Sequence, residues 1–243
     1  MSHRPSGVET LECAQTALTG LPSSSGHASF ALFDLDDTLV DRGRAFPECV
    51  RGFCQRFGLG ADVEAWLREA MYERAYQEDF ARLREEFAVS TPVEELWLGY
   101  CDVMARAVSC APEALEGLER LGAAGWRLWA VTNGAGDIQR AKLARTGLLP
   151  LFDAVCISEE VGVRKPAAGM FEAAGRMLRV EDLERGGWMV GDSLEKDVLG
   201  GRAVGLRTVW VTAETEPGTA DHCVRSVAQA VDLMLNEGGA GCV

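Results

Sequence analysis

The chain has 243 residues, of which 47% are hydrophobic, and this suits one sizeable globular domain or one domain with a smaller insertion. Its formal net charge of −13 argues against binding to nucleic acids or to anionic membrane surfaces, because both partners attract basic patches. The eight cysteines are scattered without a C-x-x-C pair, no run of about 18 apolar residues occurs, and the N-terminus lacks a secretory signal pattern. These features predict a soluble protein of the cytoplasm.

Short apolar runs alternate with helical patterns along most of the chain. The runs are short and continuous, as in strands buried on both faces of a parallel sheet, and they lie at residues 30–34, 127–133, 152–158, 187–192 and 207–212. Helical patterns lie near residues 112–124, 136–147, 167–178, 195–204 and 224–236. This alternation predicts an α/β fold with a doubly wound, Rossmann-like parallel sheet.

One long segment interrupts the alternation. Residues 42–111 separate the first predicted strand from the second, and their apolar residues recur at helical spacing in 61–76, 78–87 and 91–108. The segment also holds ten of the 18 aromatic residues. We therefore expect a helical cap at 42–111, inserted into a catalytic core that comprises 28–41 and 112–237.

The two ends of the chain show little periodicity. Residues 1–27 contain the stretch GLPSSSG, and residues 238–243 are rich in glycine. Such compositions are typical of flexible tails, which we expect at both ends.

Three carboxylates crowd the end of the first predicted strand. The stretch FALFDLDDTLV (30–40) places Asp34, Asp36 and Asp37 within four positions. Ligands of open parallel sheets bind beyond the carboxyl ends of the strands, and side chains alternate along a strand, so Asp34 and Asp36 share a side. Their repulsion is most simply offset by a divalent cation, and oxygen ligands favour Mg²⁺. Asp37 and Thr38 also fit turn and cap residues, and for Asp37 this interpretation is as well supported as a role in the site.

Other predicted strands deliver polar groups to the same edge of the sheet. Thr132 and Asn133 end the second strand, Lys165 lies in the loop after the third, and Asp192 ends the fourth, five residues before Asp197. A carboxylate beside Mg²⁺ can attack phosphorus, and a second carboxylate can carry a proton for the leaving oxygen. A hydroxyl and an ammonium group can bind the phosphoryl oxygens. Taken alone, Lys165 is also explained as an ordinary surface lysine. Asp197 is also explained as an acid near the start of a helix, where the helix dipole favours negative charge.

The motifs DLDDT, TNG, KP after a glycine-containing loop, and GDSLEKD follow one another in this order. Together they resemble the four motifs of the haloacid dehalogenase superfamily, and 42–111 lies where that superfamily carries its helical cap. The resemblance implies that Thr132 and Asn133 bind phosphate, that Lys165 neutralises charge, and that Asp197 orients this lysine or a metal-bound water.

The same resemblance implies the catalytic and metal-binding residues. Asp34 corresponds to the nucleophile and a metal ligand, and Asp36 to the general acid/base whose backbone carbonyl also binds the metal. Asp192 corresponds to the second carboxylate on Mg²⁺. The function implied is a Mg²⁺-dependent phosphatase that acts on a small phosphorylated metabolite, of the nucleoside monophosphate or sugar phosphate class, through an aspartyl-phosphate intermediate.

Three alternatives stay open at this stage. A phosphomutase uses the same two acids. A haloacid dehalogenase attacks carbon and needs neither Mg²⁺ nor a second acid, so the complete DLDDT motif counts against it. A phospho-accepting receiver domain of a signalling protein also surrounds Mg²⁺ with acids, threonine and lysine, but its acceptor follows the third strand.

Overall fold

The computed structural model describes residues 29–180, 183, 187–213 and 220–238. Its centre is a six-stranded sheet with the strand order β3-β2-β1-β4-β5-β6, in which all neighbouring strands are parallel. The strands are β1 (Phe30–Phe33), β2 (Arg127–Thr132), β3 (Ala154–Ile157), β4 (Gly187–Gly191), β5 (Arg207–Val211) and β6 (His222–Val224). The predicted α/β fold with a doubly wound parallel sheet is confirmed.

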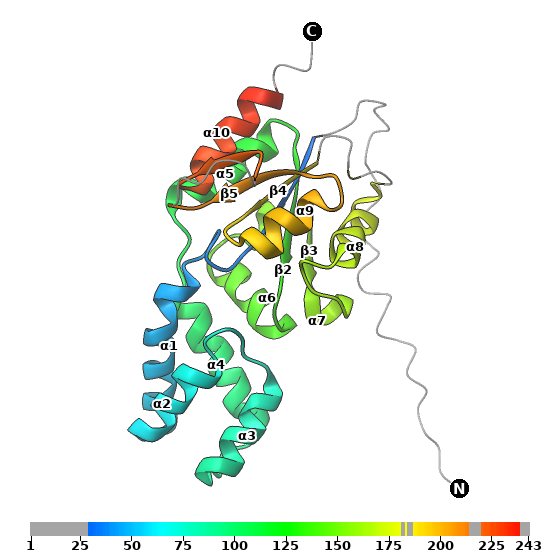
Figure 1. Ribbon diagram of the computed structural model, residues 1–243. Coiled ribbons are helices and arrows are strands. Elements are labelled where there is room, and N and C mark those ends of the chain that lie inside the picture. Colours follow the sequence, from blue (N-terminus) through cyan, green and yellow to red (C-terminus); the bar gives the residue numbers. More distant parts are fainter. Residues whose placement is uncertain (1–28, 181–182, 184–186, 214–219, 239–243) are drawn as a thin grey trace, which may run out of the picture.

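Both faces of the sheet are covered by helices (Figure 1). Alternate residues of β1 belong to different apolar clusters, because successive side chains of a strand point to opposite faces. Ala31 and Phe33 share a cluster with α5 (Pro112–Ala123), α6 (Gly136–Arg145) and α10 (Val227–Gly238). Phe30 and Leu32 share the other with α8 (Ala168–Leu178). Burial on both faces explains why the strands read as continuous apolar runs.

Residues 42–107, which follow β1 and precede α5, form four helices that lie together beside one end of the core (Figure 1). They are α1 (Arg42–Phe57), α2 (Ala61–Ala70), α3 (Gln77–Phe87) and α4 (Val93–Ala107). Phe53 and Phe80 anchor their interior, with ring centroids 5.5 Å apart, and Tyr100 lies 5.8 Å from Phe53. The predicted helical insertion is thus present, and the proposed boundaries at residues 42 and 111 stay a prediction.

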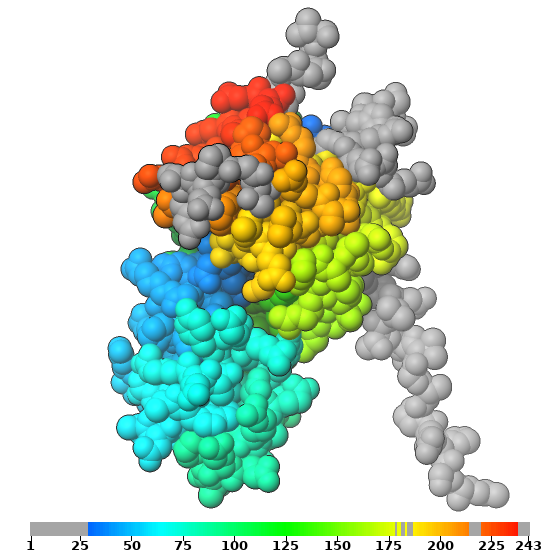
Figure 2. All heavy atoms as spheres, in the orientation of Figure 1, coloured from blue at the N-terminus to red at the C-terminus, as the bar shows by residue number. Residues whose placement is uncertain are grey.

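The insertion packs directly on the core, as the space-filling view shows (Figure 2). Its buried side chains form one continuous apolar cluster with α5, α6 and α10. Two polar contacts reinforce the junction: Trp97 Nε1 donates a hydrogen bond to Asp137 Oδ2 at 2.9 Å, and Arg164 Nη1 donates one to the Tyr76 hydroxyl at 2.6 Å. The insertion is therefore held over the core by α6 and by the loop that precedes α8.

Two elements differ from the sequence-based expectation. The short edge strand β6 is not predicted, because three residues are too few to show a periodic pattern. The helix expected at 195–204 is divided into a π-helical segment, η2 (Leu194–Leu199), and the short α9 (Gly200–Arg202). In η2 the carbonyl of Ser193 accepts hydrogen bonds from the N–H groups of both Asp197 and Val198, at 3.0 and 3.3 Å. Such wide turns are frequent at functional sites.

Two further short helices complete the described chain: η1 (Leu149–Leu151) and α7 (Ser158–Val161). Within the described ranges no helix has the length and apolar character needed to cross a bilayer. The expected N-terminal tail lies outside the described residues, as does the C-terminal tail beyond residue 238.

We predict that Gly187→Ala destabilises the fold. A Cβ atom at this position in β4 would lie 2.2 Å from Phe30 Cζ and 2.6 Å from Leu206 Cδ2, within a packed core. Overpacking of this kind costs about 1–3 kcal/mol of the free energy of unfolding, which urea denaturation measures. Gly122→Ala is the control, since its Cβ meets no atom of the described residues within 4 Å. Equal stability of the two variants would contradict the prediction.

Candidate active site

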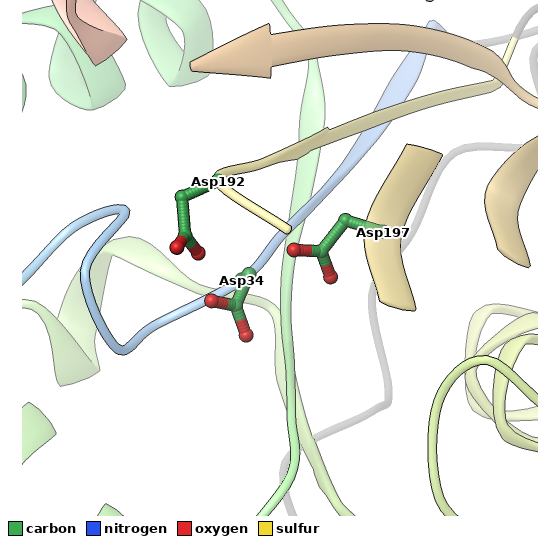
Figure 3. Close-up of side chains that lie close together, drawn as sticks. All are labelled: Asp34, Asp192 and Asp197. Carbon is green, nitrogen blue, oxygen red and sulfur yellow. The ribbon is translucent and has the colours of Figure 1, made fainter. Parts of the chain in front are cut away.

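Three aspartates converge at the carboxyl ends of β1 and β4 (Figure 3). Asp34 follows β1, Asp192 follows β4, and Asp197 lies in η2; each offers a carboxylate oxygen, and the three oxygens lie within 4.8 Å of one another. Parallel pairing of β1 with β4 brings two of them together, because Asp34 N–H donates a hydrogen bond to the Val190 carbonyl at 2.9 Å. The structure thus gathers three of the residues that the sequence singles out.

Asp197 reaches this cluster because two local features allow it. The wide turn of η2 directs its carboxylate back to the end of β4, where Oδ2 accepts a hydrogen bond from Ser193 N at 3.0 Å. Gly191 leaves space for the approach, since a Cβ there would lie 2.3 Å from Asp197 Cγ. In the GDSLEKD motif, Gly191 is therefore needed to make room for Asp197, and the next residue, Asp192, is itself part of the cluster.

Lys165 offsets the charge of this cluster from within. Its side chain is 2% exposed, and its Nζ donates hydrogen bonds to Asp34 Oδ1 at 2.6 Å and to Asp197 Oδ1 at 2.7 Å. A buried ammonium group needs such partners, because its desolvation is costly. Lys165 is thus an integral part of the cluster rather than a surface charge.

Burial, together with the neighbouring charges, shifts the pKa values of the groups in this cluster. Burial raises the pKa of Asp34 to about 8, although the Lys165 ammonium opposes the shift. Burial and the nearby Asp197 raise the pKa of Asp192 to about 6. Burial alone would lower the pKa of Lys165, yet Asp197 and Asp34 together raise it above its ordinary value. The cluster therefore holds more negative charge than its one lysine offsets, which favours a further cation.

Thr38 and Trp210 fix the position of Asp192. The Thr38 hydroxyl lies 3.1 Å from Asp192 Oδ1 and 3.3 Å from Asp34 Oδ2, and it accepts a hydrogen bond from Asp192 N at 2.9 Å. Trp210 Nε1 donates to the Asp192 carbonyl at 2.7 Å. Thr38 is a site residue that the sequence analysis assigned only to a turn or cap. Its position at the end of the DLDDT motif is the sequence feature that could have indicated a role in the site.

Asp37 forms a turn and does not join the cluster. Its φ is 61°, and its Oδ1 accepts a hydrogen bond from Gly43 N at 2.6 Å, in the first turn of α1. Aspartate tolerates this left-handed conformation because its short side chain bonds the nearby backbone. Of the two roles open to Asp37, the structure therefore supports the turn.

Thr132 and Asn133 lie at the end of β2, beside the loop that carries Lys165. The Thr132 hydroxyl accepts a hydrogen bond from Gln139 Nε2 at 2.6 Å. The Asn133 side chain is paired with the Lys165 backbone, through Nδ2 to the carbonyl at 3.0 Å and through Oδ1 to the N–H at 2.9 Å. Asn133 thus fixes the position of Lys165, and its side-chain amide is already occupied.

Asp36 faces α6 instead of the three-aspartate cluster. Its carboxylate accepts hydrogen bonds from Lys142 Nζ at 2.7 and 2.9 Å and from Gln139 Nε2 at 3.1 Å. The sequence analysis missed both partners. The signal was present, because lysine is rare in this chain and residues 139 and 142 share one face of a helix.

A cavity of about 240 Å³ opens beside these groups. The core and the insertion both contribute to its walls. From the core come Asp34, Asp36, Thr132, Lys165 and Asp192, and from the insertion come Arg42, Tyr72, Arg74 and Tyr100. The cluster is therefore reached through a space that the insertion partly covers.

A profile of the haloacid dehalogenase-like hydrolases matches residues 30–205, which include β1, the insertion and the site residues described above except Trp210. The chain belongs to this family. To the pyrimidine 5'-nucleotidase PynA of Streptococcus pneumoniae it is 30% identical over 197 residues, which cover 74% of this chain and 82% of that protein.

Two further likenesses extend the comparison. The chain is 30% identical over 243 residues to the ribulose-1,5-bisphosphate 5-phosphatase of Halopiger xanaduensis, covering 85% of this chain and 99% of that protein. The crystal structure of an HAD phosphatase from Thermococcus onnurineus has a TM-score of 0.64 and 27% identity, covering 85% of this chain and 97% of that one. The expected enzyme class, a haloacid dehalogenase-like phosphatase, is confirmed.

The aspartate cluster fits a small, hard divalent cation. All its side-chain donors are carboxylate oxygens, the ligands that Mg²⁺ prefers. Both oxygens of Asp197 already accept hydrogen bonds, from Lys165 Nζ and from Ser193 N. Asp34 and Asp192 are therefore the carboxylates best placed to bind a metal ion.

We predict a pH dependence of stability that depends on Asp34. Because the pKa of this carboxyl is raised in the folded protein, its proton stabilises the fold at low pH, and this contribution is lost as the pH rises through about 8. In chelator, the free energy of unfolding of the wild type should therefore fall relative to that of Asp34→Asn as the pH rises from about 5 to about 8.5. Denaturation at each pH tests this, and parallel profiles would contradict it.

We also predict that Lys165→Met strongly destabilises the metal-free protein. The substitution leaves Asp34 and Asp197 without their buried cation, and breaking a buried ion pair costs about 3–5 kcal/mol. Urea denaturation in chelator measures the loss. Lys196→Met is the control, because Lys196 is an exposed lysine of η2. If both variants unfold at the same urea concentration as the wild type, the charge argument is wrong.

Proposed function

We propose that this protein is a Mg²⁺-dependent phosphatase that hydrolyses small phosphomonoesters of the nucleoside monophosphate or sugar phosphate class through an aspartyl-phosphate intermediate. The observation that carries the proposal is the convergence of Asp34, Asp192 and the buried Lys165 beside a small covered cavity. The relatives named above act on a pyrimidine nucleotide and on a sugar bisphosphate, which supports this substrate class.

In this proposal Asp34 is the nucleophile. One of its carboxylate oxygens attacks phosphorus while the bond from phosphorus to the ester oxygen breaks, and an acyl phosphate forms on Asp34. Lys165 and Thr38 contact different oxygens of this carboxylate, so its orientation is fixed before substrate arrives.

Asp36 is the proposed general acid/base. It gives its proton to the departing alkoxide, and it then takes a proton from the water whose oxygen attacks the acyl phosphate. That second attack releases inorganic phosphate and restores the Asp34 carboxylate. The same residue thus serves both half-reactions.

Asp34, Asp192 and the backbone carbonyl of Asp36 are the proposed ligands of Mg²⁺. When bound, the ion neutralises charge on the phosphoryl oxygens. The Thr132 hydroxyl and the Lys165 ammonium group are the proposed contacts for these oxygens. Because the Asn133 side chain is bonded to the Lys165 backbone, a phosphate contact from Asn133 would use its own N–H group.

The insertion limits the size of the substrate. Pockets that hold drug-sized ligands measure about 300–1,000 Å³, and this cavity of about 240 Å³ is smaller. Arg42, Tyr72 and Arg74 of the insertion line it, so they are placed to contact the leaving group. A covered site of this size favours a metabolite over a phosphorylated protein and keeps bulk water from the acyl phosphate.

We predict that phosphate release requires Mg²⁺ and Asp34. A panel of nucleoside monophosphates, sugar phosphates, phosphoglycolate and an aryl phosphate is assayed with Mg²⁺ and with chelator. Asp34→Asn should lower kcat by more than about 10³-fold, because it removes the nucleophile.

The matched control is Asp62→Asn, which removes an exposed acid of α2 and should leave kcat unchanged. Circular dichroism verifies that both variants are folded. Release that persists in chelator, or that survives in Asp34→Asn, would rule out the proposed chemistry.

A further inference from the structure

The described structure contains a second buried lysine in the site, and the phosphatase chemistry above does not use it. Lys142 lies on α6, and its side chain is 2% exposed. The chain has only three lysines beside 21 arginines. A fully desolvated ammonium group is rare in proteins unless it is paired. Its partners therefore indicate what it does.

All three hydrogens of the Lys142 ammonium group have acceptors nearby. They are Asp36 Oδ1 at 2.7 Å, Asp36 Oδ2 at 2.9 Å and Gln139 Oε1 at 2.8 Å. The amide nitrogen of Gln139 in turn donates to Asp36 Oδ2 at 3.1 Å and to the Thr132 hydroxyl at 2.6 Å. With no hydrogen left to donate, Lys142 is not arranged to bind a phosphoryl group, which Lys165 already serves.

This network matters because Asp36 has little other support. Asp34 directly follows β1, and its carboxylate is held by Lys165 and Thr38. Asp36 lies farther along, in the turn after β1, and has neither of these contacts. Within the described residues, the Asp36 carboxylate is hydrogen-bonded only by Lys142 and Gln139, one turn apart on one face of α6. The helix thus determines where this carboxylate lies.

We propose that Lys142, assisted by Gln139, is the positioning residue for Asp36. It fixes the acid/base carboxylate beside Thr132, at a set place relative to the phosphoryl group. This inference rests on the proposed phosphatase function. Lys142 acts through Asp36 and does not contact the substrate.

The test uses Lys142→Met and compares leaving groups. Departure of an alkyl alcohol needs a proton from Asp36, whereas an aryl alcohol leaves with little help. For an alkyl phosphate, kcat/KM should fall by about 10- to 100-fold, because general acid catalysis contributes about 10²- to 10⁴-fold and is partly lost. For the aryl phosphate it should change by less than about threefold. A merely structural effect would lower both values equally.

Arg145→Met is the matched control, since it removes an exposed positive charge from the same helix. A second comparison adds Lys142→Met to Asp36→Asn. If Lys142 acts through Asp36, the double variant should hydrolyse the alkyl phosphate no more slowly than Asp36→Asn alone. A further decrease in the double variant would overturn the proposal.

Two other outcomes would also overturn it: kcat/KM values for Lys142→Met that match those of Arg145→Met, or equal losses for alkyl and aryl phosphates. If Lys142→Met does not fold, Gln139→Leu replaces it and should show the same selective loss for the alkyl ester. Wild-type turnover that is abolished by Asp34→Asn establishes the phosphatase separately. A negative result with Lys142 therefore counts against the positioning role alone.

Discussion

The ammonium group of Lys165 lies between two carboxylates that would otherwise repel each other, 2.6 Å from Asp34 and 2.7 Å from Asp197. Much of the surrounding structure serves this contact. The pairing of β1 with β4 brings the acids together, Gly191 leaves room for Asp197, and the Asn133 side chain holds the Lys165 backbone. Because a buried charge without a partner is costly, each of these features stabilises the fold by keeping Lys165 paired with its two carboxylates.

The two buried lysines divide the acids into separate environments. Lys165 offsets part of the charge where Asp34 and Asp197 meet, and Lys142 pairs with Asp36 from α6. Two neighbouring carboxylates in one shared environment would compete for a single proton. In the proposed mechanism, this separation places the nucleophile Asp34 and the acid/base Asp36 in different environments.

Much of the fold and part of the site follow from local sequence. Five strands are continuous apolar runs, and the polar residues at the ends of β1, β2 and β4 meet because these strands are parallel and adjacent. The roles of Thr38, Gln139 and Lys142 depend instead on distant contacts: Lys142 is 106 positions from its partner Asp36. No spacing rule links such residues. The wide turn of η2, which brings Asp197 beside Gly191, likewise has no signal in the sequence pattern.

The insertion leaves the core and returns to it at neighbouring points, since Asp41 N–H donates a hydrogen bond to the Ser109 carbonyl at 3.3 Å. Residues 41 and 109 are therefore neighbours in space, and the helices between them leave and rejoin the core at one place. Such a junction suits domain grafting: a segment of different length or shape can be exchanged there while the strand order is preserved. The proposed catalytic carboxylates and the insertion residues that line the cavity can thus change independently, because they belong to separable parts of one chain.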